Sequence, residues 1–215
     1  MTESYQDVYA RWQQDPEGFW REAARAVDWT KPPEAVFDPS SGVYGRWFPD
    51  AELNTCYNAA DRHAEGGRGD QKAIIYDSPM TGERRSYTYR DLLLEVKALA
   101  GVIASLGVGK GDRVIIYMPM VPEAVFAMLA CARLGAVHSV VFGGFAAHEL
   151  ATRLDDSEAK VVISASCGLE PGRVVAYKPL LDQAVDMARV KPSCCLILQR
   201  DQMHAVLRYE HGDVD

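Results

Sequence analysis

Two short segments of the chain combine glycines with side chains that often contact nucleotides. The first is the FGG stretch formed by Phe142, Gly143 and Gly144, between a predicted strand at residues 136–142 and a predicted helix around residues 146–155. Because glycine has no Cβ, a flat ring or a phosphate can come close to the backbone there. The helix N-terminus would add free N–H groups and the positive end of a dipole. The stretch matches neither G-x-G-x-x-G nor G-x-x-x-x-G-K-[ST], so on local sequence an ordinary strand-to-helix turn is the favoured alternative.

The second segment, SCGLEPGRVVAYK at residues 166–178, directly follows another predicted strand. Its predicted turn residues are Gly168, Pro171 and Gly172. We expect Arg173 to project from this turn, with Lys178 five residues further along the chain. Arginine is well suited to bidentate contact with a phosphate. Glu170 would partly neutralise such a site, and a surface arginine in a loop is the alternative interpretation.

Other residues, of types that often act in catalysis or bind metals, do not form a recognisable motif in this sequence. His63, His138 and His148 have no second histidine at metal-ligand spacing, and His138 lies in a predicted buried strand, which favours a hydrogen-bonded core histidine. The acidic run LDDSE at residues 154–158 is typical of a solvated turn. We find no G-x-S-x-G elbow and no zinc spacing, so the sequence predicts no catalytic residue and no metal site.

Composition restricts the class of protein. The chain has 215 residues, is 48% hydrophobic and 25% charged, and carries a formal net charge of −7. These values are typical of a soluble globular protein, and the absence of a Lys/Arg run gives no support for nucleic acid or anionic membranes as partners. No stretch approaches the ~20 apolar residues of a membrane span, and the N-terminal residues do not resemble a secretory signal. Five cysteines without a C-x-x-C pair favour reduced, buried thiols in a cytoplasmic protein.

The N-terminal region, residues 1–68, is predicted to be an irregular helical segment that wraps over something larger. It is rich in Trp and Pro, and its start predicts two short helices broken near Pro16. Asn54, Asn58 and Arg62 are four residues apart and would share one face of a further helix, which the glycines after it would end.

From residue 69 to the end, predicted strands and helices alternate. The strands are expected at residues 72–77, 82–89, 112–119, 136–142, 160–165 and 194–199. The helices are expected after Thr88, with Asp91 completing a capping box, and at residues 122–134, 146–155 and 178–190. Several strands show almost no polar alternation, as do strands buried on both faces. The pattern predicts an α/β fold with a largely parallel sheet and flanking helices.

In such sheets, ligands bind beyond the carboxyl ends of the strands. This rule places three loops on one expected functional edge: residues 118–122, 142–146 and 165–173. The two glycine-containing segments therefore belong to the same predicted ligand edge.

Three longer stretches resemble a known family. They are LNTCYNAADRH (residues 53–63), YMPMVPEAVFAMLACARLGAVHSVVFGGF (117–145) and GLEPGRVVAYKPLLDQAV (168–185). They resemble the N-terminal third of AMP-forming short-chain acyl-CoA synthetases, the acetyl- and propionyl-CoA synthetases of the adenylate-forming superfamily. The resemblance runs from about residue 5 to about residue 200, and EPGRVVAYKPLLD favours the propionyl branch.

The resemblance implies a two-step reaction. A short-chain carboxylate, acetate or propionate, attacks the α-phosphate of ATP to give an acyl-adenylate and pyrophosphate, and the thiol of coenzyme A then displaces AMP. By carry-over, Phe142, Gly143 and Gly144 would line the adenine of coenzyme A, and Gly172 and Arg173 would supply a contact to its 3′-phosphate. Glu170 stands where the acetyl enzymes carry a second arginine, which leaves one arginine at this phosphate.

The resemblance also implies what these residues leave out. The family's phosphate loop, of the form T-S-G-T-T-G-x-P-K, would follow the last residues, so residues 69–215 would be an incomplete part of the large N-terminal domain. ATP and Mg²⁺ would bind mainly downstream, and because groups that stabilise the transferring phosphoryl dominate such catalysis, we expect no activity from this chain alone. The alternative is a standalone non-catalytic domain that binds a nucleotide or a partner. An incomplete sheet should leave an apolar flank that promotes self-association.

Overall fold

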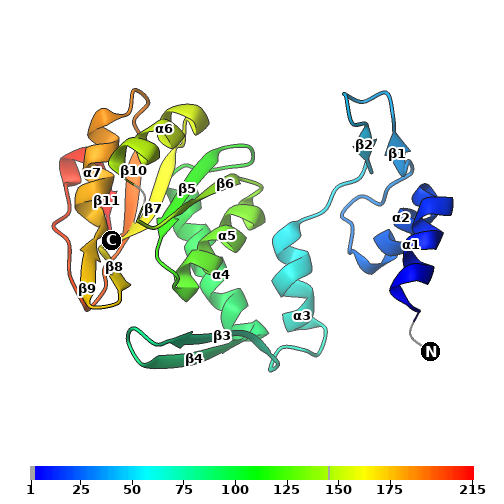
Figure 1. The fold of residues 1–215 in the computed structure, drawn as a ribbon, viewed down its shortest axis with the longest axis horizontal. Coiled ribbons are helices and arrows are strands. Elements are labelled where there is room, and N and C mark those ends of the chain that lie inside the picture. The colour runs from blue at the N-terminus through cyan, green and yellow to red at the C-terminus, as the bar shows by residue number, and fades with distance from the viewer. Residues whose placement is uncertain (1–2, 145) are drawn as a thin grey trace. The chain divides into compact units, whose positions relative to one another are not determined.

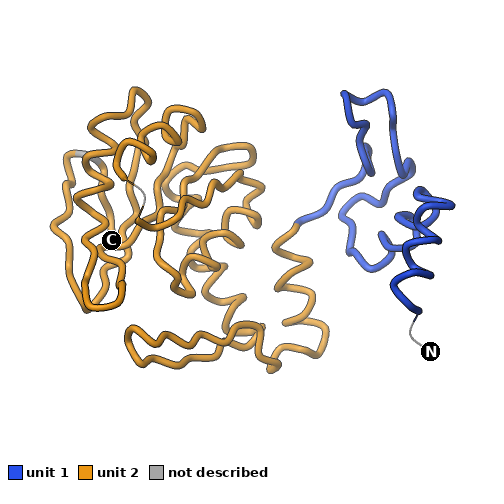
Figure 2. The backbone as a smooth tube through the Cα atoms, viewed as in Figure 1, with its two compact units in different colours: residues 1–54 blue, residues 55–215 orange. Residues whose placement is uncertain are grey.

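The computed structural model describes residues 3–144 and 146–215, which form two compact units, Met1–Asn54 and Thr55–Asp215 (Figure 2). The division lies earlier than the predicted boundary between residues 68 and 69. Cys56 and Ala60 are completely buried in the same apolar cluster as Val96 and Ala127. Residues 55–68 therefore belong to the α/β unit and contribute Cys56 and Ala60 to its core.

The first unit is small and has little buried surface. Helix α1 (Tyr5–Gln14) begins with a capping box between Ser4 and Asp7, and α2 (Pro16–Ala23) is capped by Asp15, which confirms two short helices broken near Pro16. A 3₁₀ turn (Ala24–Ala26) and two short antiparallel strands follow, β1 (Phe37–Asp38) and β2 (Arg46–Trp47). Neither α1 nor α2 has a buried residue, so aromatic contacts such as Trp20 with Trp47, 6.1 Å between ring centroids, supply much of the packing.

The second unit begins with a helix that differs from the predicted one. Residues Tyr57–Asp61 form a π-helical turn that continues into α3 (Arg62–Glu65). Asn54 precedes this helical segment, Asn58 lies in its π-turn and Arg62 begins α3, so the three residues do not belong to one regular α-helix as predicted. Asp61 is buried and its carboxylate accepts two hydrogen bonds of 2.8 Å from Nη1 of Arg133.

An antiparallel hairpin and a long helix come next. The hairpin consists of β3 (Lys72–Ser78) and β4 (Glu83–Thr88), and α4 (Tyr89–Ser105) follows directly. Thr88 and Asp91 form the predicted capping box, and Gly107, with φ of 82°, ends the helix as expected.

The main sheet has five strands, all parallel, in the order β11-β10-β7-β5-β6 (Figure 1). Its strands are β5 (Arg113–Met118), β6 (Val137–Phe142), β7 (Val161–Ala165), β10 (Cys194–Leu198) and β11 (Asp213–Val214). The connecting helices are α5 (Pro122–Leu134), α6 (Ala147–Ser157) and α7 (Tyr177–Met187). This architecture confirms the predicted α/β class.

Alternate residues of the central strands enter two separate cores. Ile116 and Ile163 pack with residues of α4 and α5, whereas Ile115 and Val162 pack with residues of α6 and α7. The adjacent Cys194 and Cys195 divide in the same way, so they face opposite sides of the sheet as a strand requires. All five cysteines are free and buried, as predicted. Among the described residues no helix is both long and apolar enough to cross a membrane.

Strand β6 corrects one expectation. We predicted residues 136–142 as a strand buried on both faces, but β6 pairs only with β5 and forms one edge of the sheet. Its exposed apolar side chains are Val137 (55%), Val140 (53%) and Phe142 (70%). His138 is half-buried on this edge strand rather than enclosed in the core.

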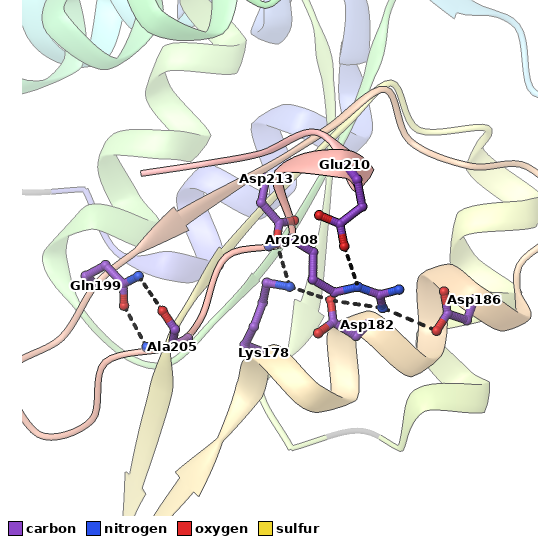
Figure 3. A network of polar contacts seen from close by, with 8 residues as sticks. All are labelled: Lys178, Asp182, Asp186, Gln199, Ala205, Arg208, Glu210 and Asp213. Atoms are coloured by element: carbon purple, nitrogen blue, oxygen red, sulfur yellow. Dashed lines mark hydrogen bonds and ion pairs between the residues drawn. The ribbon is translucent and has the colours of Figure 1, made fainter.

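The last residues return to the sheet, which the sequence did not predict. A 3₁₀ turn (Tyr209–His211) leads into β11, which lies parallel to β10. Figure 3 shows that Lys178, from α7, points at Asp213 of β11 and at Asp182, one turn along α7. Lys178 is buried, so this ion pair ties the final strand to α7.

Candidate functional site

The three loops predicted at the ligand edge meet around one hollow of about 370 Å³. Residues 118–121, 140–143 and 169–170 line it together with the end of the β3–β4 hairpin at residues 76–80. Tyr177 and Arg200 complete the wall. The carboxyl ends of β5 and β6 thus open into a shared space, as expected for a parallel sheet.

The FGG turn contributes an exposed ring and two glycines with different roles. Phe142 is 70% exposed beside the hollow. A Cβ at Gly143 would lie 2.7 Å from Cε2 of Tyr177, so this glycine allows one of the protein's own rings to approach the backbone. Gly144 has φ of 117°, a conformation that favours glycine. Helix α6 begins after this turn without a side-chain cap.

The second predicted segment is a hairpin rather than a loop. Strands β8 (Cys167–Glu170) and β9 (Arg173–Ala176) pair antiparallel around a turn at Pro171 and Gly172. Gly172 has φ of 78°, as a turn glycine should, but Gly168 lies within β8 and its assignment to the turn was wrong.

Arg173 is exposed, as expected, and is paired with Glu170. Its Nε and Nη2 atoms lie 2.8 and 2.6 Å from Oε2 of Glu170. Glu170 lines the hollow, whereas Gly172 and Arg173 lie outside its described lining. The neutralisation expected from the sequence is therefore present, and an anion at Arg173 would have to displace this carboxylate.

Lys178, the other cation noted in this segment, lies elsewhere. It is buried between Asp182 and Asp213, with Nζ 2.7 Å from Oδ2 of Asp213. Burial lowers the pKa of Lys178, but hydrogen bonds to the two carboxylates outweigh it and hold the pKa above the ordinary value. Lys178 is thus a structural cation and is not available to a ligand at the hairpin.

Sequence reasoning missed the two residues that complete the wall. The rings of Tyr177 and Tyr117 stack with centroids 5.1 Å apart. The pKa of Tyr177 is raised to about 12, mainly by burial and to a smaller extent by the nearby Tyr117 and Glu170. Arg200 follows β10 and donates from Nη1 to the carbonyl of Cys167 at 3.1 Å. Tyr177 stands beside the lysine that drew attention in the sequence, but no motif marked it.

The lining of the hollow is mainly apolar and aromatic. Its charged side chains are Asp77, Glu170 and Arg200. A hollow with an exposed aromatic ring and a few polar groups at its margin is typical of a site for a planar ligand.

Sequence comparison assigns the chain to a protein family. The sequence pattern of the AMP-binding enzymes matches residues 60–213, and that of the acetyl-coenzyme A synthetase N-terminus matches residues 5–59. The chain therefore belongs to the AMP-binding enzyme family, as the resemblance had implied.

Several curated relatives of the chain are named as acyl-CoA synthetases or CoA ligases. The chain is 47% identical over 211 residues to human mitochondrial acyl-CoA synthetase short-chain family member 3, covering 98% of this chain and 31% of the relative. It is 43% identical over 212 residues to propionate–CoA ligase of Escherichia coli K12, covering 99% and 33%. It is 48% identical over 184 residues to acetyl-coenzyme A synthetase of Streptomyces coelicolor, covering 86% and 28%.

The chain is also similar to a solved structure. Acetoacetyl-CoA synthetase from Streptomyces lividans matches with a TM-score of 0.81 and 25% identity over 95% of this chain and 33% of that one. The chain thus spans about a third of the length of the proteins it matches.

Proposed function

We propose that these residues are the N-terminal part of an AMP-forming short-chain acyl-CoA synthetase, which joins acetate or propionate to coenzyme A through an acyl-adenylate. The observation that carries the proposal is identity of 43–48% to three such enzymes over nearly the whole chain. ATP and Mg²⁺ would be held mainly by residues beyond these, and we expect no synthetase activity from the 215 residues alone.

The proposed contribution of this chain is the site for the nucleotide of coenzyme A. Phe142, Gly143 and Gly144 would line the adenine, and Gly172 and Arg173 would contact the 3′-phosphate. An exposed ring beside an apolar hollow suits adenine, because aromatic rings stack favourably on bases. The phosphate contact fits only if Arg173 exchanges the Glu170 carboxylate for the phosphate, which predicts weak binding.

Calorimetric titration of this chain with coenzyme A tests that site. Arg173→Ala should weaken binding, and Glu170→Gln should strengthen it, because the competing carboxylate is gone. A matched control is Arg153→Ala, since Arg153 also pairs with a glutamate on the surface, Glu149, at 3.1 Å. Dephospho-coenzyme A should bind wild type no better than coenzyme A binds Arg173→Ala. Equal affinities of wild type and Arg173→Ala would remove Arg173 from the site.

The activity itself is tested on the longest product of the gene. Intact mass from fresh lysate shows its length, and a coupled assay of pyrophosphate release compares acetate, propionate and butyrate. We expect propionate to be favoured, on the resemblance of residues 170–182. A mature product of 23.8 kDa without pyrophosphate release would overturn the synthetase proposal.

The alternative is a standalone, non-catalytic domain that binds a nucleotide or a partner. The exposed apolar edge of β6, with Val137, Val140 and Phe142, favours it, because large exposed apolar patches mark interaction surfaces. On either proposal this edge should promote self-association of the isolated chain. Sedimentation that shows a compact monomer at high concentration would count against that.

The location we propose is cytoplasmic. Five free, buried thiols are compatible with a reducing compartment. The human relative is named as mitochondrial, so fractionation of cells that express the protein is the direct measurement.

A further inference from the structure

We propose that Tyr177 is a positioning residue whose ring joins the glycine turn to the β8–β9 hairpin and so fixes the shape of the hollow. The link to ligand binding rests on the proposed coenzyme A site, whereas the link between turn and hairpin rests on packing alone.

The ring of Tyr177 contacts the backbone of two separate segments at positions where only glycine fits. A Cβ at Gly143 would lie 2.7 Å from Cε2, and a Cβ at Gly168 would lie 2.7 Å from Cζ. Carbon atoms do not approach this closely without displacement. The two glycines lie at the carboxyl end of β6 and within β8. One ring therefore occupies the space that two side chains would otherwise take.

A second tyrosine anchors this arrangement to the centre of the sheet. Tyr117 lies on β5, is completely buried, and stacks on Tyr177 with an interplanar angle of 28°. The phenolic oxygen of Tyr117 accepts a hydrogen bond from the backbone N–H of Gly144. The glycine turn is thus connected to β5 by a hydrogen bond and to the hairpin through the stacked rings.

The backbone of Tyr177 is held as firmly as its ring. Its N–H donates to the carbonyl of Ser166 at 3.1 Å, at the start of α7. A leucine at this position would keep the backbone bond, but it is too short to reach both glycines. The flat six-membered ring, rather than apolar bulk, is what spans the two segments.

The consequence for the site follows from what each segment carries. Phe142 stands on the glycine turn, and Glu170 and Arg173 stand on the hairpin. A ligand that contacts both segments binds best when their separation is fixed beforehand. Loss of the Tyr177 ring should leave the ligand contacts of each segment intact but allow the glycine turn and the hairpin to move relative to each other.

Amide hydrogen exchange of the ligand-free chain tests the positioning role. In Tyr177→Leu, the Gly144 amide should exchange at least tenfold faster relative to the Ile116 amide of β5, which reports global opening. Tyr177→Phe keeps the ring and should change this ratio by less than twofold. Tyr87→Leu is the matched control, since the Tyr87 ring packs edge-on against Phe126, 5.3 Å away in the core, and it should accelerate both amides alike.

If Tyr177→Leu does not fold, Gly143→Ala probes the same contact from the opposite side. Its Cβ would push against the ring, and the same selective acceleration at Gly144 is expected. An unchanged Gly144 to Ile116 ratio in the folded variant would overturn the positioning role.

Titration with coenzyme A tests the link to the ligand. Tyr177→Leu should bind at least tenfold more weakly than wild type, and Tyr87→Leu within twofold of it. If wild type binds no coenzyme A while the exchange result holds, the proposed coenzyme A site on this chain fails and the positioning role stands. If Tyr177→Leu binds as tightly as wild type, the link between Tyr177 and the ligand is wrong.

Discussion

The Nζ atom of Lys178 lies 2.7 Å from Oδ2 of Asp213, and both side chains are only 2% exposed. Asp182 contacts the same ammonium group. Nη1 of Arg208 lies 3.9 Å from Oδ1 of Asp182 and 3.3 Å from Oδ2 of Asp186 (Figure 3). A buried charge is costly unless it is paired and hydrogen-bonded. Since β11 has only two residues, this network supplies much of what holds the last strand on the sheet.

Lys178→Met should therefore destabilise the chain strongly. It leaves Asp182 and Asp213 without their cation, and removing one partner of a buried pair costs about 3–5 kcal/mol. Urea unfolding measures the loss, and limited proteolysis should cut residues 199–212 faster. Lys97→Met, at an exposed position of α4, is the control and should stay within about 0.5 kcal/mol of wild type. Equal midpoints for the two variants would contradict the structural role.

Arg133→Met should destabilise through the same physics at another place. Arg133 donates to both carboxylate oxygens of Asp61 at 2.8 Å, and Asp61 is 4% exposed. Because the variant leaves the buried Asp61 carboxylate without its cation, we expect the free energy of unfolding, measured in urea, to fall by about 3 kcal/mol. Adding Asp61→Asn removes the stranded charge and should recover part of the loss. A double variant that is no more stable than Arg133→Met would show that the charge is not the cause.

Two glycine-to-alanine substitutions should act in opposite directions. Gly144 has φ of 117°, where an L-residue is strained, so Gly144→Ala should destabilise by about 1–2 kcal/mol. Gly101 lies within α4 with open space at its Cβ position, so Gly101→Ala should stabilise by about 0.5–1 kcal/mol. Thermal or urea unfolding of both variants gives the comparison. A stabilising Gly144→Ala would mean that the turn differs from the one described.

Stability should fall at alkaline pH. Burial raises the pKa of Cys131 to about 11 and that of Cys195 to about 12, from an ordinary 9.0. The folded state therefore holds these protons more tightly, so their contribution is complete below pH 9 and is lost as pH rises through the folded pKa values. The pKa of Lys178 is also raised, so its contribution to stability is likewise lost as the pH rises. Urea midpoints between pH 7 and 11 measure the slope, which should be shallower in Cys131→Ala/Cys195→Ala.

The thiols should also react slowly in the native state. All five are buried, which limits access of the reagent. Thiolate is the reactive form, and burial raises the pKa of Cys56, Cys131, Cys194 and Cys195, which further opposes labelling of these four. At pH 8 a disulfide reagent should label few thiols in native protein and all five in urea. Rapid labelling of one thiol without urea would show a local opening that the structure does not contain.

The fold was largely predictable because its signals are local. The capping box at Thr88 and Asp91, the proline at the start of α5 and the glycine after it each define a helix end by a rule that needs no tertiary information. The apolar runs at residues 112–119 and 160–165 gave the central strands in the same way. These positions report on backbone geometry, which the residue type itself constrains.

The predictions that failed concern features that depend on contacts with distant parts of the chain. The run at residues 136–142 is as apolar as the central strands, but a sequence does not say which strand lies at the edge. At Lys178 the partner, Asp213, is distant in sequence, so the buried pair could not be anticipated. The sequence indicated close approach to the backbone at Gly143 but assigned Gly168 to a turn, and it did not indicate that the ring of Tyr177 approaches both glycines. The roles of Phe142 and Arg173 toward coenzyme A stay predictions.

Positions 143, 168 and 177 share a single volume, since the ring at one fills the room left by the other two. Natural substitutions at these sites should therefore be correlated across the family. Homologues that carry an aromatic residue at position 177 should keep glycine at the other two, and those with a small aliphatic residue there should tolerate alanine or serine. Designers who exchange this segment between branches should move the three residues as a set.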